Sequence, residues 1–159
     1  FDGTSWQRLE PILGDLTTDL HDIAQQHLAY PVLHYFHSTE RVTALAPSLA
    51  VVDEALTMLI AGKGGDGIDG LVLQRFRAGS QMLLDTLRSA FIEIGDHPPR
   101  KPSRDVLVDL SPPVADQCAW DDRLDSLAER RATLQAFVRS DGWDWDDDVC
   151  GGDSGQTSH

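Results

Sequence analysis

The stretch LEPILGDLTTDLHDIAQQH (residues 9–27) carries the pattern that decides the fold. Its core-type positions recur every three or four residues, and they are Leu9, Leu13, Leu16, Leu20, Ile23 and His27. Such spacing places all of them on one face of an α-helix. The helix is expected to end before Pro31, because proline disfavours helical backbone in the residue that precedes it, here Tyr30.

Three later segments repeat this helical pattern. Leucine and valine at the same spacing predict a second helix over residues 45–59, ended by Gly62. A third is expected from about Leu71 to Ile94, and a fourth over residues 114–140, started by Ser111-Pro112-Pro113. The fold class is therefore all-α, a bundle of about four helices in which the proline-rich residues 96–105 form an extended connector.

The charge of the chain is unevenly distributed. Its 159 residues contain 26 Asp and Glu against 13 Lys and Arg, a net charge of −13. This charge argues against nucleic-acid partners and against docking on anionic lipid. Residues 141–159 hold six aspartates and no Lys or Arg, which predicts a disordered acidic tail behind a helical domain at residues 1–140. Trp143 and Trp145 in this tail are candidates for docking on the body or on a partner.

The sequence contains no pattern typical of a catalytic site. It has no G-x-S-x-G, no H-E-x-x-H and no P-loop, so we expect no enzymatic activity and no cofactor. Cys118 and Cys150 are too few for a disulfide framework and lack CxxC spacing. Adjacent acids such as Asp53 and Glu54 point to different faces of a helix and are expected to be solvated. Asp125 and Glu129 lie near Arg130 and Arg131 in sequence, which favours pairing within the fourth helix.

Three histidines, His27, His34 and His37, lie within eleven residues. The His34–His37 pair has H-x-x-H spacing, which suits a transition metal on one helix face. A structural zinc site needs four ligands, however, and no cysteine is nearby. The main expectation is therefore no metal, with His27 hydrogen-bonded and neutral on the core-facing side of the first helix and His34 and His37 in the connector. The alternative is a free-standing helical ligand- or metal-binding module that uses His27, His34 and His37.

The connector YPVLHYF (residues 30–36) is unusually apolar, so it is expected to pack on the bundle or on a partner. Tyr30, Pro31, Tyr35 and Phe36 are the predicted interaction surface. Residues 6–94 resemble the region that follows the last membrane helix in a family of bacterial two-transmembrane potassium-channel-like proteins. The matching residues are Trp6, His27, Tyr30, Pro31, Val32, Leu33, Tyr35, Phe36, Ser38, Leu49 and Asp53, with Arg75, Arg77 and Ala78 in the helix that follows.

The resemblance implies a non-catalytic assembly or regulatory domain of a potassium-channel-like membrane protein. It implies a homo-oligomer formed through the parent channel, and contact with K⁺ only through a pore outside this chain. Phe1 would then mark a cut downstream of two membrane helices and a selectivity filter. Because we find no run of 18 apolar residues, the chain itself is expected to be soluble and to lie at the cytoplasmic face of the membrane.

Overall fold

The computed structural model describes residues 3–30, 44–63, 70–88, 93–95, 98–108 and 115–149, and all regular secondary structure in these residues is helical. The predicted all-α class is confirmed. The helices are α1 (Gly3–Ala29), α2 (Leu45–Lys63), α3 (Gly70–Arg88), α4 (Asp105–Val108), α5 (Gln117–Ser126), α6 (Ala128–Ser140) and α7 (Trp145–Asp148).

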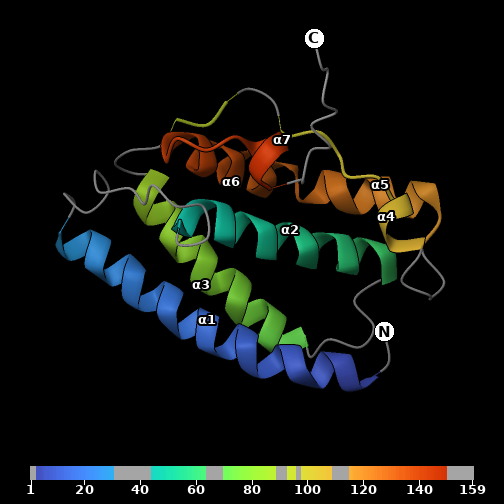
Figure 1. Ribbon diagram of the computed structural model, residues 1–159, viewed down its shortest axis with the longest axis horizontal. Helices are drawn as coiled ribbons and strands as arrows, with labels where there is room; N and C mark the ends of the chain where they lie inside the picture. The colour runs from blue at the N-terminus through green and yellow to red at the C-terminus, as the bar shows by residue number, and fades with distance from the viewer. Residues whose placement is uncertain are drawn as a thin grey trace, which may run out of the picture.

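The helices form two groups that meet along α3 and α6 (Figure 1). The long helix α1 lies at one edge of the molecule and packs chiefly on α3. On the other side, α2 packs on α5 and α6, and the short helices α4 and α7 contact α2 and α6 respectively. Helix α2 consequently lies in the middle of the fold, between the α1–α3 pair and the α5–α6 segment.

The close packing of α1 on α3 depends on their facing residues. Leu13 and Leu20 of α1 are buried, as their place in the predicted apolar face requires. On α3, Gly79 lies against Thr17 of α1, and the absence of a side chain at position 79 allows the two helices to approach closely. The first helix ends at Ala29, before Pro31, as predicted.

One apolar cluster joins the two groups of helices, and a smaller cluster lies at the far end of α2. The main cluster includes Leu13, Leu20, Leu49, Phe76, Leu83, Leu84, Leu87, Leu134, Phe137, Val138 and Trp145. The smaller cluster contains Ala61, Leu107, Trp120 and Leu124. Helix α2 contributes to both clusters, so its two halves are held by different neighbours.

The third and fourth helices differ from their predicted ranges. Helix α3 ends at Arg88, and Glu93, Ile94 and Gly95 are not helical, although Ile94 still packs on the main core. The expected fourth helix is divided into α5 and α6 at Leu127, whose backbone leaves the helical region (φ −111°, ψ 8°). This break lets α5 bury residues in the smaller cluster while α6 serves the main one.

The start of α5 and the region after α6 also differ from expectation. Asp116 caps α5 by accepting a hydrogen bond from the Ala119 amide at 2.9 Å, so this helix begins at Gln117, four residues after Pro113. The acidic tail is not confirmed, because residues 145–148 form α7 and Trp145 is only 1% exposed. Docking of Trp143 and Trp145 on the body is confirmed. Residues 150–159 lie outside the described residues.

Candidate functional site

Two adjacent acids on α2 meet two adjacent arginines on α6. Asp53 and Glu54 are 0% and 4% exposed, and Arg131 is 2% exposed. Arg130 reaches Asp53 and Arg131 reaches Glu54, so each of the two neighbouring acids is bound by a different arginine. These four side chains form the most deeply buried group of charges in the described part of the chain, and we call them the double ion pair.

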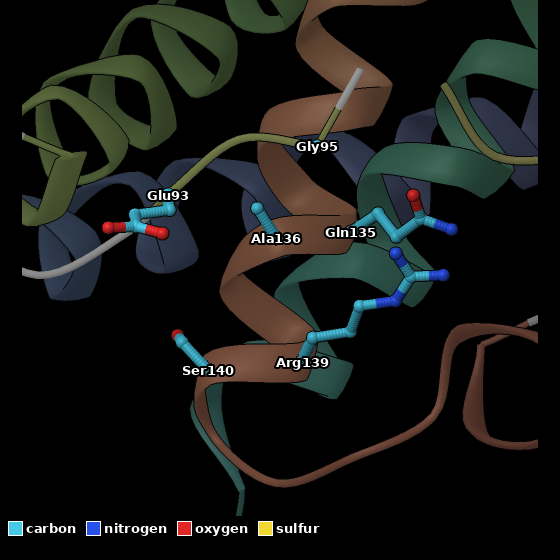
Figure 2. Close-up of a pocket in the computed structure, with 6 residues that line it drawn as sticks. All are labelled: Glu93, Gly95, Gln135, Ala136, Arg139 and Ser140. Carbon is cyan, nitrogen blue, oxygen red and sulfur yellow. The ribbon is translucent and has the colours of Figure 1, made fainter. Parts of the chain in front are cut away.

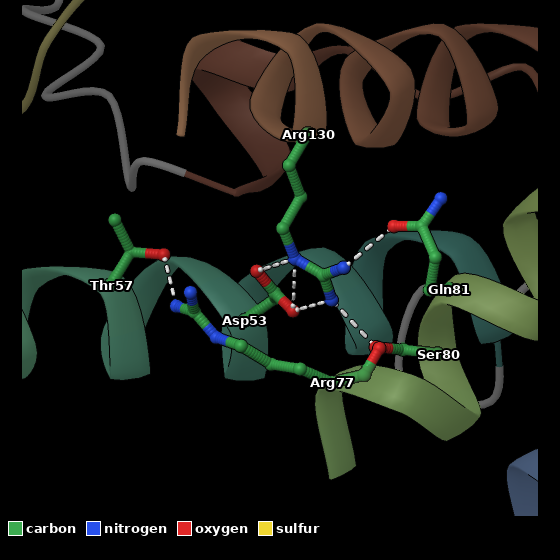
Figure 3. A network of polar contacts seen from close by, with 6 residues as sticks. All are labelled: Asp53, Thr57, Arg77, Ser80, Gln81 and Arg130. Carbon is green, nitrogen blue, oxygen red and sulfur yellow. Dashed lines mark hydrogen bonds and ion pairs between the residues drawn. The ribbon is translucent and has the colours of Figure 1, made fainter. Parts of the chain in front are cut away.

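The first of the two pairs also includes α3 (Figure 3). Arg130 Nε donates to both carboxylate oxygens of Asp53, at 3.0 and 3.1 Å, and Arg130 Nη2 donates to Asp53 Oδ2 as well. The same guanidinium donates to Ser80 Oγ at 2.6 Å and to Gln81 Oε1 at 2.9 Å. Arg130 therefore connects α6 to both α2 and α3.

The second pair holds a segment without regular structure. Arg131 Nε donates to the two carboxylate oxygens of Glu54, at 2.9 and 3.1 Å, and Arg131 Nη2 donates to Glu54 Oε1 at 2.6 Å. The remaining donors of Arg131 bind the backbone carbonyls of Pro99 at 3.2 Å and Arg100 at 2.8 Å. The proline-rich connector, described in part, is fastened to the core by this arginine.

The double ion pair corrects two sequence expectations. Asp53 and Glu54 are buried where solvation was expected, and Arg130 and Arg131 pair with α2 and not with Asp125 or Glu129. Glu129 instead lies 3.6 Å from Arg88, and Asp125 lies 2.7 Å from Lys101. A sequence signal existed: the two acids stand alone in an otherwise apolar helix, and a charge in such a helix needs a buried partner.

The chemistry available to these groups is structural. A carboxylate bound bidentately by a guanidinium has its oxygens occupied, so it is a poor general base for a substrate. What the arrangement does well is to join three helices and a connector at one place. Removing one partner of such a pair is costly, since the other charge is left buried and alone.

The predicted histidine and aromatic residues lie largely outside the described residues. His27 is half-buried on α1, and its Nδ1 lies 3.0 Å from the Ile23 carbonyl oxygen. His34 and His37 are outside the described ranges, as are Pro31, Tyr35 and Phe36. Among the described residues, no three His, Cys, Asp or Glu side chains are grouped closely enough to hold a metal ion. The three-histidine module stays a prediction.

Tyr30 is the one member of the predicted interaction surface that the structure describes. Its side chain is 65% exposed at the end of α1, and its backbone amide donates to the Gln26 carbonyl at 2.8 Å. The phenol ring is therefore free to contact another surface, while the backbone of the residue is still held by the helix.

A shallow hollow of about 440 Å³ lies beside the C-terminal half of α6 (Figure 2). Glu93 and Ser140 lie on one side of Ala136, and Gln135 and Arg139 lie on the other. Ser140 Oγ donates to the Phe137 carbonyl at 2.8 Å, so its hydroxyl proton is already used. Gly95 completes the lining. The lining therefore holds one carboxylate, that of Glu93, and one hydroxyl, that of Ser140, whose proton is donated to the backbone.

Comparison with known proteins gives one curated relative and no family. The chain is 25% identical over 146 residues to the uncharacterized membrane protein YdjJ of Bacillus subtilis (strain 168). The alignment covers 91% of this chain and 43% of the relative, so the chain spans less than half the length of the protein it matches. No family model matches, and no solved structure matches.

The expected localisation as a soluble fragment at the cytoplasmic face is contradicted. A protein named as a membrane protein aligns with nearly the whole chain. In addition, the described residues include one segment, Leu45–Gly62 of α2, that could cross a membrane by its length and composition. It has 18 residues and a mean hydropathy of 1.5. The sequence test failed because Asp53 and Glu54 interrupt the apolar run without lowering its average much. Other parts of the protein bury 56% of this segment.

Proposed function

We propose that this chain is a non-catalytic assembly or regulatory region of a larger, potassium-channel-like membrane protein. The proposal rests on what the double ion pair does in the fold. Asp53, Glu54, Arg130 and Arg131 hold α2, α3, α6 and the connector to one another. Buried charged side chains that hold helices together favour a region that maintains or transmits an arrangement of helices. They do not favour a region that presents reactive groups.

Two further observations support the same proposal. The relative that aligns with most of this chain is named a membrane protein and is more than twice as long as the aligned region, which leaves ample length for membrane helices elsewhere. The resemblance of residues 6–94 to the potassium-channel-like family supplies the class of parent protein. Homo-oligomerisation, a K⁺ pore and the contact surface that begins at Tyr30 belong to this proposal.

The test uses the whole parent protein in liposomes loaded with K⁺. The parent protein is expected to carry a K⁺ flux that exceeds its Na⁺ flux. Tyr30→Ser is expected to change that flux or the number of subunits, because it removes an exposed aromatic ring from the proposed contact surface. Leu28→Ser is the control, since Leu28 is 61% exposed two residues before Tyr30, in the last turn of α1, but outside that surface. Absence of K⁺ flux together with a monomeric protein would overturn the proposal.

A further inference from the structure

Arg77 of α3 is a partly buried cation without a carboxylate of its own. Its Nη2 donates to Thr57 Oγ1 of α2 at 3.0 Å, and Thr57 is fully buried. The Nε atom of Arg77 is buried and has no hydrogen-bond partner. The nearby carboxylate of Asp53 already accepts three hydrogen bonds from Arg130 (Figure 3).

The group therefore holds more positive than negative charge. Arg77 and Arg130 bring two guanidinium groups to one carboxylate, that of Asp53. By contrast, Arg131 has Glu54 to itself and two backbone carbonyls for its remaining donors. Burial lowers the pKa of Arg77, with Asp53 acting against that shift and Arg130 reinforcing it. A guanidinium in this position is better solvated by water than by its neighbours.

The excess positive charge at Arg77 acts at the contact between the two groups of helices. Arg77 lies on the boundary between the two groups of helices, α1 with α3 on one side and α2 with α5 and α6 on the other. Across this boundary, α3 is tied to the other group by Arg77 to Thr57 and by Arg130 to Ser80 and Gln81. Separation of α3 from α2 would bring the Arg77 guanidinium into water.

We propose that Arg77 makes the α2–α3 boundary a built-in release point, at which α1 and α3 open together from α2, α5 and α6. Opening exposes apolar core, which opposes it, but it also restores hydration to a partly buried excess cation whose Nε has no hydrogen-bond partner, which favours it. Local opening of this kind draws on the least stable part of a fold. The two helices move as one unit because α1 packs chiefly on α3. This inference does not depend on the proposed function.

Hydrogen exchange followed by mass spectrometry on the full chain tests the release point. In the unaltered protein, amides of α1 and α3 are expected to exchange together, at least tenfold faster than those of α2 and α6. Arg77→Met keeps much of the side-chain volume and removes the charge, so it is expected to slow exchange in α1 and α3 by about tenfold or more and to leave α2 and α6 unchanged. Arg75→Met is the control, because Arg75 is exposed on the same helix.

A second variant supplies the missing charge. Thr57→Asp places a carboxylate opposite Arg77 and is expected to slow exchange in α1 and α3 as well. Equal exchange rates in the two groups of helices would overturn the proposal. Faster exchange in α1 and α3 with Arg77→Met, or failure of that variant to fold, would also overturn it, because both results would mean that the arginine stabilises the boundary.

Discussion

A Cβ atom at Gly79 of α3 would lie 3.3 Å from Thr17 Cγ2 of α1 and 3.5 Å from the Thr17 carbonyl oxygen. Thr17 has little freedom to move away, because its Oγ1 donates to the Leu13 carbonyl at 2.6 Å. At this contact between the two helices, a glycine on one therefore faces a hydrogen-bonded threonine on the other.

A larger residue at this contact should force the helices apart. We expect Gly79→Leu to lower the free energy of unfolding by roughly 1–3 kcal/mol, the usual cost of overpacking, as measured by urea denaturation. Gly14→Leu is the matched control, since nothing lies within 4 Å of a Cβ at Gly14. The control should stabilise the chain by about 0.5–1 kcal/mol through helix propensity. Equal effects at the two positions would contradict the close contact.

Breaking the second pair of the double ion pair, Arg131 with Glu54, should destabilise the fold strongly. We expect Arg131→Met to destabilise the chain by roughly 3–5 kcal/mol, because Glu54 would remain buried without a partner. Arg88→Met is the control: its contact with Glu129 is 3.6 Å long and both side chains are at least half exposed, so its loss should cost less than about 1 kcal/mol. Denaturation midpoints of the two variants measure the difference.

Replacing both partners distinguishes pairing from simple loss of packing. The double variant Glu54→Met with Arg131→Met should recover most of the stability that Arg131→Met loses, since no charge is left buried. If the double variant were as unstable as the sum of the two single variants, the ion pair would not be the cause of the loss.

Trp145 tests whether the residues after α6 belong to the fold. Because its side chain is 1% exposed within the main core, we expect Trp145→Ala to destabilise the chain by roughly 3–5 kcal/mol. Its fluorescence gives a second measurement: loss of this tryptophan should reduce the blue-shifted emission of the folded state. A variant with unchanged stability would favour the acidic tail that the sequence pattern predicts.

Substitution of one acidic residue, Asp116, tests the N-cap of α5. Asp116→Ala should cost about 1 kcal/mol, because the Ala119 amide loses its acceptor. Asp122→Ala removes an exposed acid later in the same helix and should change stability by less than 0.5 kcal/mol or so. Thermal unfolding followed by circular dichroism compares the two variants, and equal shifts in Tm would argue against a capping role.

Periodicity predicted the helices whose apolar face is continuous. The apolar faces that begin at Leu9 and Leu45 predicted ranges close to those of α1 and α2. Gly62, the predicted stop of the second helix, is itself helical, and α2 continues to Lys63. The break at Leu127 was missed because it carries neither proline nor glycine. Tertiary packing explains it: Trp120 and Leu124 fill one cluster, while Leu134 fills the other.

The double ion pair could not be predicted from the spacing of residues, for a different reason. Each pair joins residues 77 positions apart, and local spacing says nothing about contacts at that distance. Composition placed the aspartates of residues 141–149 in a tail, yet the neighbouring tryptophans supply enough apolar surface to hold part of that segment on the body. The burial of these tryptophan rings outweighs the acidic composition of the segment as a whole.

The pairing of two consecutive acids with two consecutive arginines also determines the register of α6 against α2. If α6 slid by one helical turn, about 5.4 Å along its axis, both pairs would separate at once and four charges would be stranded in the interior. Leucines at the same interface tolerate such a shift, since one apolar side chain can replace another. The charges thus exclude misaligned forms of the bundle that the apolar residues alone would permit.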